Sequence, residues 1–195
     1  MKRIKNHSQK VTRIITREEE AKIVRLLRSP EHRGKSYHTD VADLVEVLAD
    51  TGMRVGEALG LRKEDICFMK RLITVRVTKG HHRPVPMTRR VATILKRRQE
   101  AGQDRPPFNL SDMQIRMAWS WARVRIGIDD AGSLVLYSLR KSCAKRLVDA
   151  GVDLAIVYAW LGYGAIRKEH RSVRLPLKKL KTAAEMLDRL NLSRQ

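Results

Sequence analysis

Cysteine is scarce in this sequence: Cys67 and Cys143 are the only two among 195 residues. Neither has histidine partners at the spacing of metal ligands, so the sequence argues against a zinc module, and we expect both thiols to be reduced and structural. His81, His82 and His170 are scattered over polar segments that offer no carboxylate at ligand spacing. We therefore expect neither a metal nor a cofactor.

Long apolar runs are also missing. No segment is long enough to span a bilayer, and the N-terminal residues lack the apolar core of a signal peptide. This predicts an intracellular protein, cytoplasmic or nucleoid-associated, with no membrane partner. Acidic residues number only 21 against 41 lysines and arginines, which gives a formal net charge of +20. Such a field attracts polyanions, so DNA or RNA is the expected partner.

The sequence predicts a short basic arm followed by one folded domain. Residues 1–15 are basic and show no hydrophobic period, so we expect an arm or the remnant of a linker. We expect residues 16–195 to form one domain, because the hydrophobic content of 43% is enough for a core. Thr16 and Glu19 have the pattern of a capping box and predict a helix that ends near Arg28.

Further helices follow from similar signals. Apolar residues at helical spacing, preceded by capping side chains and ended by glycine or proline, predict them. We expect helices from Thr39 or Asp40 to Thr51, within 53–61, over 88–100, from Ser111 with Gln114 through Val124, from Ser138 to Ala150, from Asp153 to Gly162 and from Leu177 to Leu190.

The middle of the chain predicts a small antiparallel hairpin. Residues 72–78 alternate between apolar and polar side chains in the manner of a strand. Residues 83–87, RPVPM, predict a second strand whose prolines suit the edge of a sheet. We then expect Lys79 and Gly80 to form the turn between the two strands.

Three basic residues occupy positions suited to a phosphate. We expect Arg54 at a turn between two helices, where Glu57 can fix its guanidinium and leave donors for a phosphate. On this segment alone, a plain Arg–Glu surface pair is the favoured explanation. Lys79 at the hairpin tip can reach into a groove, although hairpin lysines are usually only solvated. Arg140 lies in the first turn of a helix, where the backbone N–H groups and the helix dipole favour anions.

In their order and spacing, these segments resemble the catalytic domain of the tyrosine recombinase or phage integrase family, from about Thr16 to Leu190. The two arginine boxes are similar to TGMRVGEALGL and YSLRKSCAKRLVDAG, and the lysine hairpin to VTKGHHRPVPM. The resemblance implies that Arg54, Lys79 and Arg140 are catalytic. It also implies a mostly helical α+β fold with a small antiparallel sheet, duplex DNA with paired target sites as the partner, and a homodimer or tetramer on that DNA.

The same resemblance implies a reaction. A tyrosine attacks the scissile phosphate and gives a 3'-phosphotyrosyl link and a free 5'-hydroxyl, while arginines stabilise the transition state and a lysine protonates the leaving oxygen. Tyr137 stands where the family usually has histidine, and Tyr163 where it has histidine or tryptophan. Both hydroxyls can still donate to a phosphate oxygen. Ser172, nine residues after Tyr163, stands where the nucleophilic tyrosine is expected.

Ser172 is a poor substitute for that tyrosine, because its hydroxyl lies a whole ring closer to the backbone and is far less acidic than a phenol, with its pKa of about 10. Three explanations stay open: a replacement that silences cleavage, a displaced alignment, or the action of another tyrosine such as Tyr163. We favour the first. We expect Tyr158, inside an apolar helical run, to be a core residue with its hydroxyl at the edge. One of Trp119 and Trp121 should be core as well, since the two cannot share a helix face.

Three functions fit the sequence. The leading hypothesis is the catalytic domain of a site-specific DNA recombinase or integrase. The second is a non-catalytic DNA-binding relative that keeps the phosphate clamp, and Ser172 argues for it. The third is a basic RNA-binding domain, which would show no preference for duplex DNA.

Overall fold

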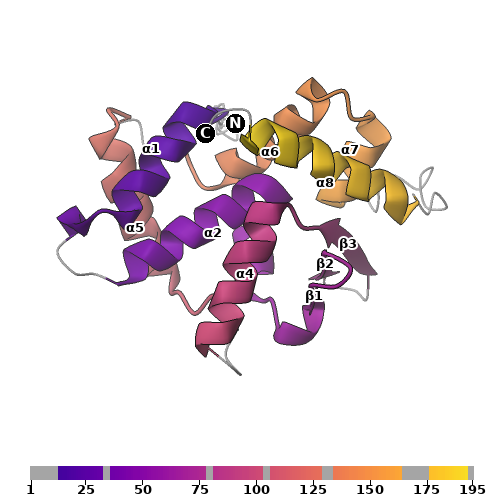
Figure 1. The fold of residues 1–195 in the computed structure, drawn as a ribbon. Coiled ribbons are helices and arrows are strands. Elements are labelled where there is room, and N and C mark those ends of the chain that lie inside the picture. Colours follow the sequence, from indigo (N-terminus) through magenta and orange to yellow (C-terminus); the bar gives the residue numbers. More distant parts are fainter. Residues whose placement is uncertain are drawn as a thin grey trace, which may run out of the picture.

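The fold is mostly helical, with a small sheet at one side (Figure 1). The computed structural model describes residues 13–32, 36–77, 81–102, 106–128, 134–163 and 176–192. None of the helices in these ranges is long and apolar enough to span a membrane. The α-helices are α1 (Arg17–Arg28), α2 (Tyr37–Thr51), α3 (Val55–Leu59), α4 (Arg89–Gly102), α5 (Asp112–Arg125), α6 (Tyr137–Asp149), α7 (Leu154–Leu161) and α8 (Leu177–Leu192).

The sheet has three antiparallel strands in the order β1-β2-β3. They are β1 (Ile66–Cys67), β2 (Leu72–Val77) and β3 (His81–Pro86). The predicted hairpin and the mostly helical α+β fold class are confirmed, and the strand with the prolines lies at an edge, as expected. β1 escapes prediction because two residues are too few to show an alternating pattern.

Local capping chemistry sets several helix starts as predicted. The Thr16 hydroxyl accepts from the Glu19 N–H, and the Glu19 carboxylate accepts from the Thr16 N–H. Ser111 and Gln114 form the same reciprocal pair at the start of α5. Asp153 accepts from an amide N–H in the first turn of α7. Each pair satisfies backbone donors that the helix leaves unbonded.

Two other helix starts were predicted wrongly. α2 begins at Tyr37, before the expected caps Thr39 and Asp40, and its N-cap residue Ser36 makes no side-chain capping bond. α6 begins at Tyr137, so Ser138 lies inside the helix; its hydroxyl accepts from the Val135 N–H. In both cases the helix extends by a turn or less beyond the side chain that resembled a cap, because packing of the first turn outweighs the local signal.

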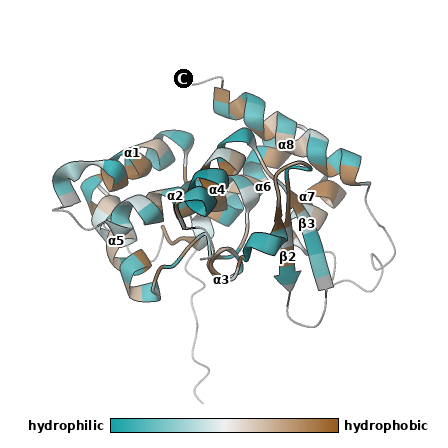
Figure 2. Cartoon of the chain, turned by 60° about the horizontal axis from the view of Figure 1, so that its bottom comes forward, coloured by the Kyte–Doolittle hydropathy of each residue, from teal (hydrophilic) through white to brown (hydrophobic). Residues whose placement is uncertain are grey.

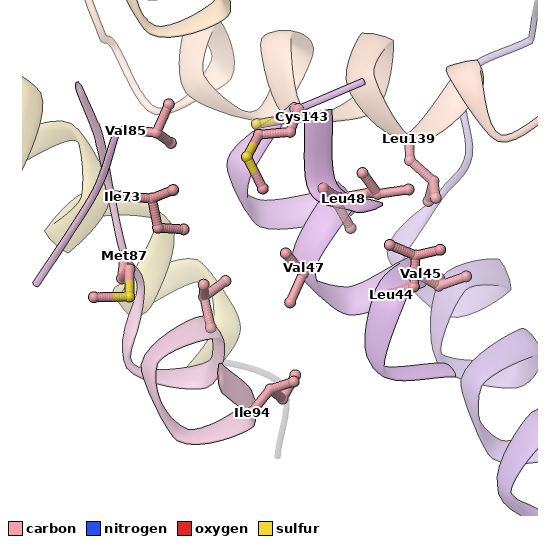
Figure 3. Packing of buried hydrophobic residues seen from close by; sticks show 14 of the residues in the cluster. Leu44, Val45, Val47, Leu48, Ile73, Val85, Met87, Ile94, Leu139 and Cys143 are labelled. Carbon is pink, nitrogen blue, oxygen red and sulfur yellow. The ribbon is translucent and has the colours of Figure 1, made fainter. Parts of the chain in front are cut away.

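The core is built around α2, which packs against α1, α4, α5 and α6. Buried side chains of α2, such as Val47 and Leu48, lie near those of the sheet (Figure 3). Twelve of the fifteen residues of α2 are buried. Side chains from the sheet, α4 and α6 converge on it, among them Ile73, Val85, Ile94 and Leu139, none more than 4% exposed. Hydrophilic and hydrophobic residues alternate around α1, α5 and α8, whose apolar sides pack toward this core (Figure 2).

The two tryptophans of α5 have different surroundings. Trp119 is buried, and its indole N–H donates to the Leu134 carbonyl at 3.1 Å, so the expectation of one core tryptophan is confirmed. Trp121 is partly buried; the Arg125 guanidinium lies 4.1 Å from its ring centroid, and the His38 ring meets it edge-on. The chain's own cationic and aromatic side chains therefore cover Trp121.

Three carboxylates of α2, those of Asp43, Glu46 and Asp50, are buried and paired with arginines. Asp50 accepts from the Arg90 Nη2 at 2.5 Å, and Asn191 of α8 adds a bond of 3.0 Å. Burial alone would raise the pKa of Asp50, but the charge and hydrogen bonds of Arg90 lower it, so the carboxylate stays ionised. The remaining pairs come from α1 and α4 through Arg28, Arg90, Arg97 and Arg98. Together these pairs hold α2 in place, and the loop that carries the site starts directly after this helix.

Candidate phosphate-binding site

Arg54 lies in the short loop that connects α2 to α3. The loop starts at Gly52, whose φ of 62° is the left-handed conformation that glycine adopts at low cost. The Arg54 N–H donates to Glu57 at 2.8 Å, and its guanidinium donates to the same carboxylate at 3.0 Å. The Arg54 side chain is still 50% exposed. The predicted Arg54–Glu57 pair is thus confirmed, and the guanidinium is held in place while part of it faces outward.

Glu57 has a second cationic partner, Arg83 of β3, which the sequence analysis missed. The two terminal nitrogens of Arg83 donate to the two oxygens of Glu57, each at 2.8 Å. Burial alone would raise the pKa of Glu57, but the hydrogen bonds from Arg83 and Arg54 outweigh it and hold this pKa at about 2. The sequence contains one signal for this pair: Arg83 stands two residues before the inward-facing Val85 and so shares its face, which puts a charge on the apolar side of the strand.

Arg140 is buried, with an exposed fraction of 1%. Its Nη1 donates to the Gly52 carbonyl and its Nη2 to the Leu161 carbonyl, both at 2.5 Å. Its Nε lies 3.3 Å from the Tyr163 hydroxyl, and the Tyr163 ring covers the guanidinium at 4.8 Å. Arg140 therefore ties the first arginine loop to the end of α7. The prediction that it lies in the first turn of a helix is confirmed, but its burial was not foreseen.

Two tyrosines form the outer layer over Arg140. The hydroxyls of Tyr137 and Tyr163 lie 3.3 Å apart, and Tyr137 is 45% exposed. The bond to Tyr163 and partial burial raise the pKa of Tyr137. For Tyr163, burial would raise the pKa, but the bonds from Tyr137 and Arg140 outweigh it and lower this pKa. Tyr158 packs edge-on against Tyr163 and is 50% exposed, so the prediction that it is a core residue was wrong.

Tyr158 was misassigned because α7 is too short to be buried on all sides. Its helix is apolar throughout, yet its buried residues are confined to one face, made by Val157, Trp160 and Leu161. Tyr158 follows Val157 directly and is therefore turned to the side of this face, where it is half exposed. A uniformly apolar run of eight residues does not reveal which side is covered.

The described part of the chain thus brings together Arg54, Tyr137, Arg140 and Tyr163. The charge of Arg54 acts on both tyrosine hydroxyls, and the Arg140 guanidinium reaches the loop next to Arg54. Other predicted positions lie outside the described residues: Lys79, Ser172, His170 and most of the basic arm at 1–15. Within the described ranges, no three His, Cys, Asp or Glu side chains form a group that could hold a metal ion.

Cys143 and Cys67 are free thiols, which agrees with the expectation that both are reduced. Burial raises the pKa of Cys143 to about 12, so its thiol stays protonated and unreactive at neutral pH. Cys143 packs against the site loop, and a Cβ at Gly52 would approach its sulfur to 3.3 Å. The thiol therefore supports the loop by packing against it.

The chain as a whole matches a known protein family. The model described as "Phage integrase family" matches residues 14–174. The chain belongs to the phage integrase family. Tyrosine recombinase XerA of Pyrococcus furiosus is 26% identical to this chain over 180 residues, which cover 88% of this chain and 60% of XerA. The chain thus spans about three fifths of the length of this relative.

Several solved structures have a fold similar to that of this chain. The integrase from mycobacterium phage Brujita superposes with a TM-score of 0.63 at 20% identity, covering 87% of this chain and 56% of that one. The XerH site-specific recombinase, solved in a pre-cleavage complex with its difH substrate, gives a TM-score of 0.61 at 20% identity and covers 97% of this chain and 54% of that one. At this identity the likeness establishes the fold.

Proposed function

We propose that this chain is the catalytic domain of a site-specific DNA recombinase or integrase, which binds duplex DNA at paired target sites as a homo-oligomer. The observation that carries the proposal is the cluster of Arg54, Tyr137, Arg140 and Tyr163 at the meeting point of the α2–α3 loop, α6 and the end of α7. It presents one guanidinium and two hydroxyls as donors around a buried cation. Membership of the phage integrase family and the DNA complex of the related XerH recombinase support it.

The donors suit a phosphodiester better than a neutral ligand. Arg54 keeps donors beyond those that bind Glu57 and is half exposed, so it can bind two oxygens of one phosphate. Tyr137 and Tyr163 add hydroxyl donors, and the positive charge of Arg140 beneath them strengthens the attraction to an anion. The net charge of +20 favours long-range attraction of duplex DNA to any such site.

The reaction for which such a site is suited is phosphoryl transfer. Arg54 would stabilise charge on the non-bridging oxygens as the pentavalent transition state forms, and Lys79 would protonate the leaving 5'-oxygen. The attacking group of the family is a tyrosine, which forms a 3'-phosphotyrosyl link that a second strand later displaces. In this sequence Ser172 occupies that position, so we propose that the domain binds its target and that strand cleavage is silenced at this residue.

A second candidate is a non-catalytic DNA-binding relative that uses the same phosphate clamp for binding alone. Ser172 is the specific observation that favours it, because a serine at this position lacks both the reach and the acidity of tyrosine. The two candidates differ in one respect. A silenced recombinase still assembles a site for cleavage, whereas a relative specialised for binding need not keep that site.

A covalent trapping experiment separates these candidates. Duplexes bound by the protein are first enriched from a randomised DNA pool and resynthesised with a nick beside each phosphate in turn. Wild type and Ser172→Tyr are then incubated with these suicide substrates and run on a denaturing gel. We expect an adduct with Ser172→Tyr only. An adduct with wild type would mean that another residue attacks, and no adduct with either protein, despite binding, would favour the non-catalytic relative.

The enrichment step is itself a test. An RNA-binding domain predicts equal binding to a matched RNA, so wild type is titrated with the enriched duplex and with RNA of the same sequence. We expect tighter binding to the DNA duplex and a steep loss of affinity with salt, since cations on the protein displace counterions from the phosphates. Equal affinities for the two would contradict the proposed function.

A further inference from the structure

We infer that Arg83 is a positioning residue that sets the distance between Arg54 and the Arg140–Tyr163 pair. The inference rests on the proposed function only in taking a DNA phosphate as the ligand of these groups. Arg83 lies on β3, and its side chain is only 8% exposed, so it is not itself available to DNA. Its three donor nitrogens all bind groups that hold the site, on two different elements.

The first element is α3. Arg83 donates through both terminal nitrogens to the two oxygens of Glu57, and this fork fixes the plane of the carboxylate. The same carboxylate then accepts the Arg54 N–H and one nitrogen of the Arg54 guanidinium. Glu57 is the only link between the two guanidiniums among the described contacts. The orientation of Arg54 therefore depends on Arg83 through Glu57.

The second element is the end of α7. The Nε of Arg83 donates to the Trp160 carbonyl at 3.1 Å, and the next carbonyl, that of Leu161, accepts from Arg140. Gly162 follows with a φ of 78°, and a Cβ there would lie 2.9 Å from the Cδ of Arg83. The turn that leads to Tyr163 thus packs directly on the Arg83 side chain, with no space for a larger residue.

Arginine is required for this role because of its shape. A planar guanidinium with donors on two edges can bind a carboxylate along one edge and a carbonyl from Nε. A lysine at position 83 would keep the charge, but its single ammonium could not hold both oxygens of Glu57 and the Trp160 carbonyl in the same plane. Arg83→Lys therefore keeps the positive charge beside Glu57 but removes the hydrogen bonds that fix the orientation of the carboxylate.

The test compares Arg83→Lys with the matched control Arg98→Lys. Arg98 of α4 is also mostly buried, at 15% exposure, and also binds carboxylates and a backbone carbonyl, those of Asp40, Asp43 and Pro107, away from the site. Both variants and wild type are titrated with the enriched duplex by fluorescence anisotropy, at a temperature where circular dichroism shows all three folded. We expect Arg83→Lys to bind about tenfold more weakly and Arg98→Lys to bind within about twofold of wild type.

A double-mutant cycle with Arg54→Gln separates positioning from a general structural effect. If Arg83 acts through Arg54, Arg83→Lys costs little once Arg54 is glutamine, so the two changes are not additive. Additive losses, or equal losses for Arg83→Lys and Arg98→Lys, would overturn the inference.

If Arg83→Lys fails to fold, Gly162→Ala displaces the Arg83 side chain from the other direction, and its cycle with Arg54→Gln must show the same non-additivity. Failure of wild type to bind duplex DNA would instead count against the proposed function.

Discussion

The hydroxyl of Tyr163 lies 3.3 Å from the Nε of Arg140 and 3.3 Å from the hydroxyl of Tyr137. Arg140 is buried, and its two terminal nitrogens bind backbone carbonyls. The Tyr163 ring covers the guanidinium, and the Tyr163 hydroxyl accepts a hydrogen bond from its Nε. A phosphate at this site would therefore meet phenolic hydroxyls before it met the guanidinium.

Removing the Tyr163 hydroxyl should weaken DNA binding. We expect Tyr163→Phe to raise the Kd for the enriched duplex about fivefold, because one hydrogen bond to an anionic oxygen is lost. Tyr158→Phe is the matched control, since Tyr158 is exposed, packs on Tyr163 and makes no described hydrogen bond through its hydroxyl within the site. Anisotropy titrations of the three proteins measure this, and equal effects of the two substitutions would contradict the role given to Tyr163.

The lowered pKa of Tyr163 predicts a pH dependence for binding. As pH rises through this pKa, the hydroxyl loses the proton that it would donate and gains a negative charge that repels phosphate. DNA affinity of wild type should therefore fall on the alkaline side at a pH below that of an ordinary tyrosine. Titrations from pH 7 upward should show this fall in wild type and a flatter profile in Tyr163→Phe.

Arg140 and Arg167 should differ sharply in their effects on binding. Arg140→Ala leaves the Gly52 and Leu161 carbonyls without their donor, which we expect to cost about 2–4 kcal/mol of stability, and it removes the cation beneath Tyr163. Arg167 belongs to the basic stretch after Gly162 and lies outside the described residues. As one of several cations in that stretch, it should contribute general attraction to phosphates, so we expect Arg167→Ala only to reduce affinity in a salt-dependent way. Titrations at two salt concentrations, below the melting temperature of both variants, measure this; equal losses would count against the proposed site.

Glu57 should make stability depend on acid pH. Its pKa in the folded protein is about 2, below the ordinary value of 4.5, so its contribution is fully present above about pH 4.5 and is lost as pH falls toward 2. We expect this contribution to be on the order of 2 kcal/mol after allowing for partial exposure. Urea unfolding at several pH values should show wild type losing this advantage over Glu57→Gln as the solution is acidified. Glu64→Gln, which alters an exposed carboxylate, should leave the wild-type profile unchanged.

Two glycines at the first arginine loop should respond to alanine in opposite ways. Gly52 has a positive φ, and a Cβ there would meet the Leu161 Cδ2 at 2.6 Å, so Gly52→Ala should cost about 2 kcal/mol or more. Gly56 lies inside α3 with open space where its Cβ would point, so Gly56→Ala should stabilise by about 0.5–1 kcal/mol. Melting temperatures of the two variants decide this, and a neutral Gly52→Ala would contradict the packing described for the loop.

Sequence signals predicted the parts of the fold that depend on neighbours along the chain. The capping pairs at Thr16 and Ser111 and the alternation of the hairpin are set within a few residues, so they can be read directly. The pairing of Arg54 with Glu57 falls in the same class. Ser138 resembled a cap for local reasons, but packing moved the helix start to Tyr137.

The parts that escaped prediction depend on contacts between distant segments. Arg83 and Glu57 are 26 residues apart, and the residues around each of them give no indication that the two will pair. The burial of Arg140 results from carbonyls at Gly52 and Leu161, which meet only after α2 and α7 have packed on α6. A family resemblance identified Arg54 and Arg140 as important, but it carried no information on which of them would be exposed.

The burial of α2 has a consequence for how this protein tolerates mutation. Its twelve buried positions include three carboxylates, each matched to arginines on other helices, so the helix has almost no face on which substitutions are free. Over evolutionary time, changes in α2 would need a compensating change elsewhere, whereas the outer face of α5, with Met113 66% exposed, could drift independently. A saturation library screened for folded protein should therefore be most depleted along α2.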